Sequence, residues 1–465
     1  MIPTEPYWQR AARPELPAYR GQDVRADVAV IGAGLSGLSA AYHLLLLRPG
    51  LRVVVLEAER LGAGASGRTT GMLGPGVGQS LPALVRRLGE KPARALYEAT
   101  LAAVSYVGAL IEREGIECEL KLSGQLMVAR SFRGDRGGRR RLAATAELMR
   151  RLELPVEALD DDALSATLRL RAPGDREHPA LGPAALRLPL AGTLHPVKLV
   201  AGLAQRVLSR GGIIYEQARV RSIHVNDAGK GRCVGPRIHL PVCGAEQAEG
   251  RVTAEKVVVA TAGYTKALGI LRGRILPVHL QALCTEPLDE EARAAIGWRG
   301  EEGLLDARRL FSYCRLTADR RIIFGGCAPR YYFGGRAAAP CQAEAAALDE
   351  LAAELHSTFP SAAHLVVAGG WTGVIGYVLD ALPAIAALPG CPQIVHAVGW
   401  CGHGVALGTA SGKWVAQLLC EGAPSDDVRE LSWFRASVPG VPTEFLRWAG
   451  FSAAVRWMAL QDRLA

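Results

Sequence analysis

The sequence predicts an α/β protein of two domains, one of them assembled from pieces that lie far apart in the chain. A length of 465 residues exceeds what one simple core usually needs. Apolar runs typical of buried strands precede glycine-rich turns and helical patterns at residues 27–47 and again at 393–419. Between them, residues 81–160 have helical spacing, whereas "RILPVHLQALCTEPL" and "RLFSYCRLTADRRIIFGG" alternate like strands. We therefore expect the second domain to be an α+β unit on a mixed sheet.

Composition and charge favour a soluble enzyme over a nucleic-acid-binding protein. Hydrophobic residues make up 49% and charged residues 21% of the chain, which also contains 53 glycines. The net charge of +9 comes from arginines spread along the chain, with one dense patch in "RSFRGDRGGRRRL", residues 130–142. A nucleic-acid surface interleaves aromatic and basic residues, and this patch has only Phe132. We expect a solvated loop there and no nucleic-acid partner.

The ten cysteines predict no metal site. No CxxC pair occurs, so we expect free, mostly buried thiols in a reducing compartment. Cys401, His403 and Cys420 imitate three ligands of a Rieske-type iron–sulfur centre, but Ala423 stands where the second histidine should fall. We expect neither a cluster nor another metal.

Neither a secretion signal nor a membrane span is expected. The N-terminal residues carry prolines and charges where a signal would have an apolar core. The most membrane-like stretch, "AYHLLLLRPG", is far shorter than the roughly 20 apolar residues that cross a bilayer, so it is interpreted as the end of a core helix. The expected location is cytoplasmic.

The turn from Gly32 to Gly37 has the spacing of a dinucleotide-binding motif. It follows an apolar strand and opens a helical pattern, the context that this motif requires. Gly32 permits the tight turn, Gly34 lets the backbone approach a pyrophosphate, and Gly37 lets the helix pack against the strand. The helix N-terminus then presents free N–H groups and its positive dipole end to the phosphates.

An acidic residue at the end of the next strand strengthens this interpretation. Glu57 ends "LRVVVLE" and lies 20 residues after Gly37 (57 − 37), where a carboxylate hydrogen-bonds a ribose hydroxyl. A carboxylate in that place disfavours NADP, because it would repel the 2′-phosphate. FAD and NAD both remain open at this point.

The following stretch, "AERLGAGASGRTTGMLGPGVG", is too rich in glycine to be the helix of a simple NAD-binding fold. From here the chain resembles the FAD-dependent amino-acid and amine oxidases of the D-amino-acid oxidase superfamily, in particular the gamma-glutamylputrescine oxidases. The resemblance extends through "GTLHPVKLVAGLA", "VVVATAGYT", "FSYCRLTADRRIIFGG", "WTGVIGYVLDALPAIA" and "GWCGHGV". It implies a Rossmann-like FAD-binding domain of the glutathione-reductase type, interrupted by the substrate domain.

The resemblance also implies where the domains and the cofactor contacts lie. The FAD-binding domain is expected to comprise residues 24–80, 193–265 and 361–430, the substrate domain residues 81–192 and 266–360, and a helical tail residues 431–465. The expected FAD contacts form five short segments plus one position near the adenine: Gly32, Ala33, Gly34, Leu35, Ser36 and Gly37; Glu57 and Ala58; Arg68, Thr69, Thr70, Gly71 and Met72; Thr261, Ala262 and Gly263; Gly399, Gly402, His403, Gly404 and Val405; and Val220.

The second glycine-rich turn, residues 399–405, is expected at the flavin end of the same FAD. Backbone N–H groups and a helix N-terminus placed there stabilise the negative charge of a reduced flavin. Relatives that attach FAD through a cysteine carry it near the start of the segment corresponding to "GGWTGVIGY", which has none here, so the expected FAD is non-covalent.

The resemblance implies oxidation of an amine or amino acid to an imine, with oxygen as the acceptor. Trp371, Tyr377, Tyr313, Arg315 and His403 are the candidate pocket residues, and plain packing explains the first four equally well. His403 is favoured as a structural or flavin-contact residue over a base, His195 as a helix entry, and Asp380 as a turn residue over the partner of a cationic amine. Two alternatives stay open: a dehydrogenase with a quinone or protein acceptor, and an electron-transfer FAD subunit without catalysis.

The C-terminal segment predicts an amphipathic helix. Trp448, Phe451, Val455 and Met458 fall on one helical stripe, with arginines nearby. Packing of this stripe against the protein's own FAD-binding domain or a second subunit is favoured over contact with a membrane.

Overall fold

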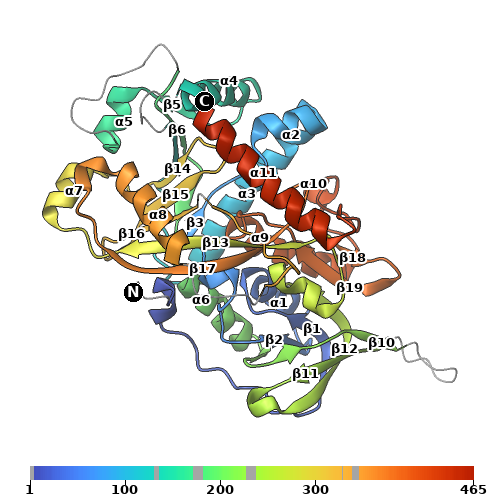
Figure 1. Cartoon of the computed structure of the whole chain (residues 1–465). Helices are drawn as coiled ribbons and strands as arrows, with labels where there is room; N and C mark the ends of the chain where they lie inside the picture. The colour runs from blue at the N-terminus through green and yellow to red at the C-terminus, as the bar shows by residue number, and fades with distance from the viewer. Residues whose placement is uncertain are drawn as a thin grey trace.

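The computed structural model describes residues 5–129, 136–170, 182–226, 237–326, 328–337 and 345–464. Two large sheets and one two-stranded ribbon, β3 (Met72–Leu73) with β7 (Gly192–Thr193), organise these residues. Figure 1 shows helices packed around both sheets. The predicted α/β class, with one Rossmann-like unit and a mixed second sheet, is confirmed.

The first sheet has a five-stranded parallel part that carries both glycine-rich turns, with antiparallel strands added to it. Its nine strands in the described part of the chain are β1 (Val24–Ile31), β2 (Val53–Leu56), β8 (Ile213–Tyr215), β9 (Arg219–Val220), β10 (His224–Asn226), β11 (Arg237–Cys243), β12 (Glu249–Val259), β18 (Ala384–Leu388) and β19 (Cys391–Val398). Strands β8, β2, β1, β12 and β19 lie side by side in parallel. Their carboxyl ends therefore meet at one edge, where ligands bind in such sheets.

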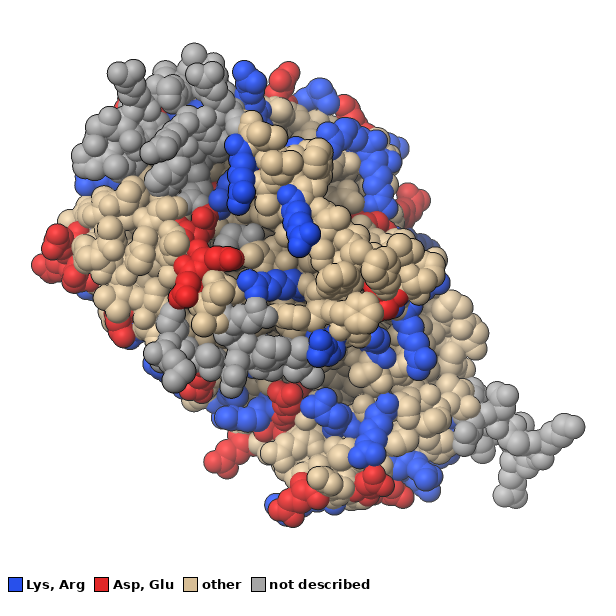
Figure 2. Space-filling view, viewed as in Figure 1, with Lys and Arg blue, Asp and Glu red and all other residues tan. Residues whose placement is uncertain are grey.

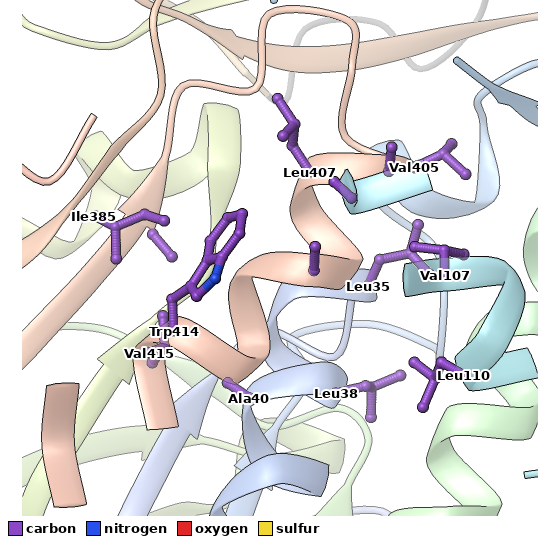
Figure 3. Close-up of a cluster of buried hydrophobic side chains, with 14 of the residues drawn as sticks. Leu35, Leu38, Ala40, Val107, Leu110, Ile385, Val405, Leu407, Trp414 and Val415 are labelled. Carbon is purple, nitrogen blue, oxygen red and sulfur yellow. The ribbon is translucent and has the colours of Figure 1, made fainter. Parts of the chain in front are cut away.

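Successive side chains of β1 point to opposite faces of the sheet and so belong to two different hydrophobic cores. Val28 and Val30 face a cluster built with helices α1 (Leu35–Leu47), α3 (Glu90–Arg113), α6 (Pro196–Ser209) and α9 (Ala406–Glu421). Ala29 and Ile31 point to the opposite face, toward β9 and β11. Figure 3 shows the first cluster, in which side chains of α1 and α9 meet those of α3.

The second sheet is mixed, as expected. Its order in the described residues is β17 (Val367–Tyr377), β13 (Leu276–Thr285), β16 (Ile322–Gly326), β15 (Ser312–Leu316), β14 (Gly303–Asp306), β4 (Gln125–Val128), β6 (Ala185–Leu188) and β5 (Glu157–Leu159). All neighbours are antiparallel except β14 and β4. Helices α5 (Asp161–Thr167), α7 (Glu290–Ile296) and α8 (Ala345–Thr358) cover one face, packing on Leu283 and Phe324.

The remaining elements are short helices and the C-terminal helix. They are η1 (Tyr7–Arg10), η2 (Ala65–Gly67), η4 (Ala245–Gln247), η5 (Ala262–Leu268), η6 (Pro360–Ala362), α2 (Leu81–Leu88), α4 (Arg136–Arg151), α10 (Asp426–Arg429) and α11 (Glu444–Leu464). Residues 136–142 of the arginine patch begin α4, so the expected loop is wrong for this part, and residues 130–135 lie outside the described residues.

Two elements cross the expected domain ranges. Helix α3 lies in the range 81–192, yet Val104, Val107 and Leu110 pack in the cluster of α1 and α9 (Figure 3). It is long and apolar enough to cross a bilayer, but half of its most apolar window is buried inside the protein, as in a core helix. Strand β17 lies in the range 361–430, yet it pairs with β13 in the second sheet.

Candidate active site

Four sequence-predicted segments follow the carboxyl ends of four adjacent parallel strands. Gly32 follows β1, Glu57 follows β2, residues 260–263 follow β12, and Gly399 follows β19. The sheet topology thus brings to one edge residues that are up to 367 positions apart in the chain (399 − 32). Sequence reasoning grouped them by resemblance, and the strand order supplies the physical cause.

Glu57 connects the first two of these segments. Its Oε2 accepts a hydrogen bond from the Ala33 N–H at 2.9 Å, and its Oε1 accepts one from the Glu59 N–H at 3.0 Å. Burial raises the pKa of this carboxyl, and the two N–H donors oppose the rise. The carboxylate is therefore fixed beside the glycine turn.

The glycines of the first turn are required by close backbone contacts. Gly32 has a φ of +102°, and a Cβ added there would lie 2.7 Å from the Ala260 carbonyl oxygen. A Cβ on Gly37 would lie 1.9 Å from the Gly32 carbonyl oxygen, so only glycine lets α1 approach β1 this closely. At Gly34 the nearest atom would be Ser66 Oγ, at 2.8 Å.

Residues 63–72, which follow β2, cross in front of the N-terminus of α1 and are called the crossing segment here. Ser66 Oγ accepts a hydrogen bond from the Leu35 N–H at 3.0 Å. Arg68 donates from Nε to the Ala63 carbonyl and from Nη1 to the Thr372 carbonyl at 3.0 Å, and its own carbonyl accepts from Trp371 Nε1 at 2.8 Å. Arg68 therefore fastens this segment to β17 of the second sheet.

The end of this segment is held by β7. The Leu194 N–H donates to the Gly71 carbonyl at 2.8 Å, and Met72 pairs with Thr193. Gly71 has a φ of +80°, and a Cβ there would meet the Leu194 carbonyl oxygen at 2.2 Å. Thr69 and Thr70 lie between these two anchors.

The second turn opens α9, which runs parallel to α1 in close contact. A Cβ on Gly408 would lie 2.8 Å from Ser36 Oγ, and one on Gly412 would lie 2.3 Å from the Ser39 carbonyl carbon. Ser39 Oγ also donates to the Thr409 carbonyl at 2.5 Å. Because the contacts advance together along both helices, the two N-termini lie at the same end (Figure 3).

The N-cap residue of neither helix supplies a capping side chain, although Ser66 Oγ accepts from the Leu35 N–H of α1. The α1 N-cap is Gly34 and the α9 N-cap is Val405, and the first turn of each helix has no acidic residue. By contrast, Asp160 and Asp289 cap α5 and α7 through their side chains. A pair of helix N-termini without acidic residues is suited to binding an anion.

His403 lies in the second turn and faces Gly76, just beyond the crossing segment. A Cβ on Gly76 would lie 3.2 Å from the His403 Cε1. Burial lowers the pKa of His403 to about 4, partly opposed by the backbone at Val77 and Pro75. The ring is therefore neutral at neutral pH, and a pKa this low makes it a weak base.

The positions expected near the adenine lie in β9 and in the turn after β12. Val220 lies in β9, 7% exposed, within the core that also contains Ile31. Ala262 has a φ of +44°, and a Cβ on Gly263 would lie 3.0 Å from the Ile375 carbonyl oxygen. The turn after β12 therefore also contacts β17.

Strand register places four candidate pocket residues on one face of the second sheet. Trp371 pairs with Ala282, Ala282 with Gly325, and Gly325 with Tyr313. Side chains of directly paired residues share a face, and residues two apart on a strand return to it. Tyr377 and Arg315 therefore lie on the same face, opposite the one that α5, α7 and α8 cover.

Three of these candidates have evident packing roles. Trp371 is fully buried with Trp8 and Ile323. Tyr377 packs beside Leu276, and burial raises its pKa to about 12. Tyr313 lies over Gly325, where a Cβ would be 2.8 Å from its Cε2.

Arg315 is a buried cation without a carboxylate partner among the described residues. It is 1% exposed and donates from Nε to the Leu316 carbonyl at 2.9 Å and from Nη1 to the Leu194 carbonyl. Burial lowers its pKa to about 10. Since Leu194 also holds Gly71, Arg315 supports the crossing segment from the second sheet.

His195 and Asp380 have structural partners. His195 Nδ1 accepts from the Lys198 N–H at 3.2 Å, which confirms the expected helix entry at α6. Asp380 is 8% exposed and pairs with both Arg435 and Arg87, so its charge is already neutralised within the fold.

Sequence reasoning missed Trp8, which lies in η1. Trp8 is fully buried, donates from Nε1 to the Thr69 carbonyl at 2.7 Å and stacks edge-on against His195 at 4.7 Å. The next residue, Gln9, donates to the Gly62 carbonyl at 3.1 Å. The only sign in the sequence that this segment is buried was a Tyr-Trp pair among otherwise polar residues.

Comparisons with known proteins agree with this geometry. The family model described as "FAD dependent oxidoreductase" (DAO) matches residues 27–418. Gamma-glutamylputrescine oxidoreductase of Escherichia coli K12 is 30% identical over 405 residues, covering 86% of this chain and 84% of that protein.

Solved structures show the same fold. Glycine oxidase from Geobacillus kaustophilus superposes with a TM-score of 0.67 at 21% identity, covering 89% of this chain and 99% of that one. L-proline dehydrogenase from P. horikoshii gives 0.66 at 19% identity, covering 89% and 97%. The chain therefore belongs to the DAO family of FAD-dependent oxidoreductases.

Proposed function

We propose that this protein oxidises the CH–NH or CH–NH2 bond of a small amine or amino acid to an imine, which water then hydrolyses. The observation that carries the proposal is the pair of parallel helix N-termini of α1 and α9, neither with an acidic residue in its first turn, at the edge that also bears Glu57. The 30% identity to gamma-glutamylputrescine oxidoreductase supports an amine donor.

The residues at this edge fit FAD. The α1 N-terminus and the glycine cradle of residues 32–37 would hold the pyrophosphate, and Glu57 would accept a hydrogen bond from the ribose. The α9 N-terminus, at residues 402–405, would face the flavin end. When bound, the flavin supplies an acceptor for a hydride. We propose that it is held non-covalently.

The protein's own part in the reaction is electrostatic and positional. The α9 N-terminus favours negative charge where it develops, without a proton transfer. His403 stays neutral because burial lowers its pKa, so we assign it a contact role and not that of a base. The substrate amine itself must then lose its ammonium proton before oxidation, and turnover should rise with pH.

The substrate is proposed to enter between the crossing segment and the face of the second sheet opposite α5, α7 and α8. Tyr313 and Tyr377 lie on that face. We propose that the FAD-binding and substrate domains divide as expected from the sequence, except that β17 belongs to the substrate sheet and α3 packs in the core of the FAD-binding domain. Oxygen is the proposed acceptor and the cytoplasm the proposed location.

Anaerobic mixing of the holoprotein with amines tests the donor class. Polyamines, gamma-glutamyl diamines, secondary amines and D- and L-amino acids are compared by loss of the flavin's visible absorbance. At least one class should bleach it, faster at higher pH. Bleaching by a hydroxy acid or a reduced protein, with no response to any amine, would refute the proposal.

Acid precipitation tests the mode of attachment. Intact FAD should appear in the supernatant. Flavin that stays with the pellet would show a covalent bond and contradict this part of the proposal.

A further inference from the structure

Helix α11 lies on the surface, yet it has large apolar side chains on two faces. It spans Glu444–Leu464, and none of its residues is buried. In Figure 1 it crosses the side of the molecule turned toward the viewer. A helix that is apolar on all sides is normally covered on all sides. One face of α11 therefore lacks its partner in the described structure.

The inner face is fixed to the protein at both ends. Glu444 accepts hydrogen bonds from Tyr331 Oη at 2.9 Å and from the Gly334 N–H at 2.7 Å. Asp462 accepts from the N–H groups of Arg309 at 3.0 Å and Leu310 at 2.9 Å. These contacts determine which side of the helix faces outward.

The predicted apolar stripe occupies this inner face. Phe451 lies 5.9 Å from the Tyr331 ring, centroid to centroid, and packs in the cluster that contains Leu276 and Val278. Trp448 meets Phe333 edge-on at 6.2 Å. The stripe therefore packs against the protein itself, but the expected partner, the FAD-binding domain, is wrong: these partners lie within residues 266–360.

A second apolar stripe, which the sequence reading missed, covers the outer face. At about 100° per residue, Leu446, Trp457, Leu460 and Leu464 lie on the side opposite Glu444 and Asp462. Their exposed fractions are 55%, 60%, 45% and 79%. Such residues scattered singly are normal, but a contiguous stripe marks an interaction surface.

The charges beside the outer stripe are positive. Arg456 and Arg463 flank it, are exposed, and have no carboxylate partner among the described residues. The two acidic residues of α11, Glu444 and Asp462, both point inward and are already bonded. Figure 2, with the same viewpoint, shows several blue Lys and Arg side chains beside uncharged tan surface.

We propose that the outer face of α11 docks on the surface of an anionic lipid bilayer. An apolar stripe with aromatic residues and flanking arginines is the pattern by which a helix lies in the headgroup region. Because its inner face is fixed to the protein along the helix, α11 lies flat on the membrane and does not span it. This proposal is independent of the proposed amine oxidation.

Charge argues against a second copy of the chain as the occupant. A two-fold pairing of the outer stripes would bring Arg456 and Arg463 of both copies together, and the outer face offers no acidic residue to pair with them. Like charges in such a contact are destabilising. Anionic headgroups supply the missing negative charge.

Vesicle sedimentation with the FAD-loaded protein tests the proposal. One set of vesicles contains equal parts phosphatidylcholine and phosphatidylglycerol, and the other only phosphatidylcholine. The protein should sediment with the first set far more than with the second, and added salt should release it. Each of Arg456→Glu and Arg463→Glu should lower partitioning by roughly fivefold or more.

The apolar contribution has its own variants and a matched control. Trp457→Glu and Leu460→Glu should each lower partitioning on the order of tenfold or more. Val366 is 62% exposed, close to the 60% of Trp457, and lies just before β17, whose other end, Tyr377, packs near α11. Val366→Glu should therefore leave partitioning unchanged.

Several results would overturn the proposal. They are failure of the unmodified protein to sediment with anionic vesicles, equal binding to both vesicle types, and equal losses in Val366→Glu and Trp457→Glu. A dimer that Trp457→Glu converts to a monomer, without vesicle binding, would identify a second copy as the occupant. Flavin content and melting temperature of each variant separate loss of binding from loss of folding.

Discussion

Gly412→Ala tests whether the close approach of α1 and α9 forms the cofactor site. A Cβ at this position would lie 2.3 Å from both the carbonyl carbon and the Oγ of Ser39, and 2.5 Å from the Ala40 nitrogen. Ordinary contacts begin at 3.4 Å, so the helices must separate by about 1.1 Å (3.4 − 2.3). Two of these three atoms belong to the backbone, so a side-chain rotation cannot relieve the contact.

The expected cost combines two effects of opposite sign. Replacing a helical glycine with alanine gains about 0.5–1 kcal/mol of stability by itself. Overpacking of a close contact costs about 1–3 kcal/mol, so the net result is a less stable protein. Because both N-termini lie at the proposed cofactor edge, a separation of this size should also weaken FAD binding.

Two further glycines make this a graded series. At Gly408 the nearest atom to an added Cβ is Ser36 Oγ, 2.8 Å away, which can rotate, so Gly408→Ala should cost less. Gly450 in α11 has nothing within 4 Å, so Gly450→Ala should be neutral or stabilising. Urea unfolding of the apoproteins and FAD titration measure the series. If Gly412→Ala matches Gly450→Ala in both, the two helices do not depend on this contact.

Four further predictions address other parts of the structure. Gly404→Val should retain folding, because an added Cβ meets only Trp400 at 3.5 Å, but should lose flavin reduction and sulfite binding; full activity would refute the role of the second turn. Glu57→Ala should weaken FAD binding by about 1–3 kcal/mol in titrations of the apoprotein, since it removes an acceptor from the ribose; an unchanged affinity would contradict this. Asp380→Asn should cost about 1–3 kcal/mol in urea unfolding, because it removes the negative charge that two partly exposed arginines share. The order of amine preference should stay the same, whereas an altered order would give Asp380 a substrate role. Burial lowers the pKa of His43 and of His396 to about 4, below the ordinary 6.5, so between these pH values the unfolded chain binds more protons than the folded one. Stability should therefore fall as the pH drops from 6.5 toward 4, by at most about 1.4 kcal/mol per pH unit for each histidine. Urea midpoints at neutral and acidic pH measure this, and equal midpoints would contradict it.

The fold and much of the cofactor edge could be predicted because their signals are local. A strand, a glycine turn and a helix follow each other within residues 27–47, and Glu57 comes at a fixed spacing. Each of these features depends on neighbours in the sequence. The mixed second sheet could likewise be predicted from the alternation in β13 and in the hairpin of β15 and β16.

The features that sequence reasoning missed depend on partners far away in the chain. Trp8 is buried only because residues 62–69 and His195 fold onto it. Strand β17 joins the second sheet because β13, almost 100 residues earlier, offers its edge. The outer stripe of α11 could be recognised only after Glu444 and Asp462 had shown which face is docked.

The helix caps supply a signal that is both local and functional. In α5 and α7 the sequence provides Asp160 and Asp289 as N-caps, with further acidic residues in the first turn. In α1 and α9 it provides glycine and valine and no acidic residue, although each bare N-terminus carries about half a positive charge. Two such ends side by side repel each other, and the glycines of α9 permit the close helix packing that keeps them adjacent. The protein thus brings two positive helix ends to one edge, which favours an anionic ligand, and we propose that one FAD approached from both ends accounts for both glycine turns.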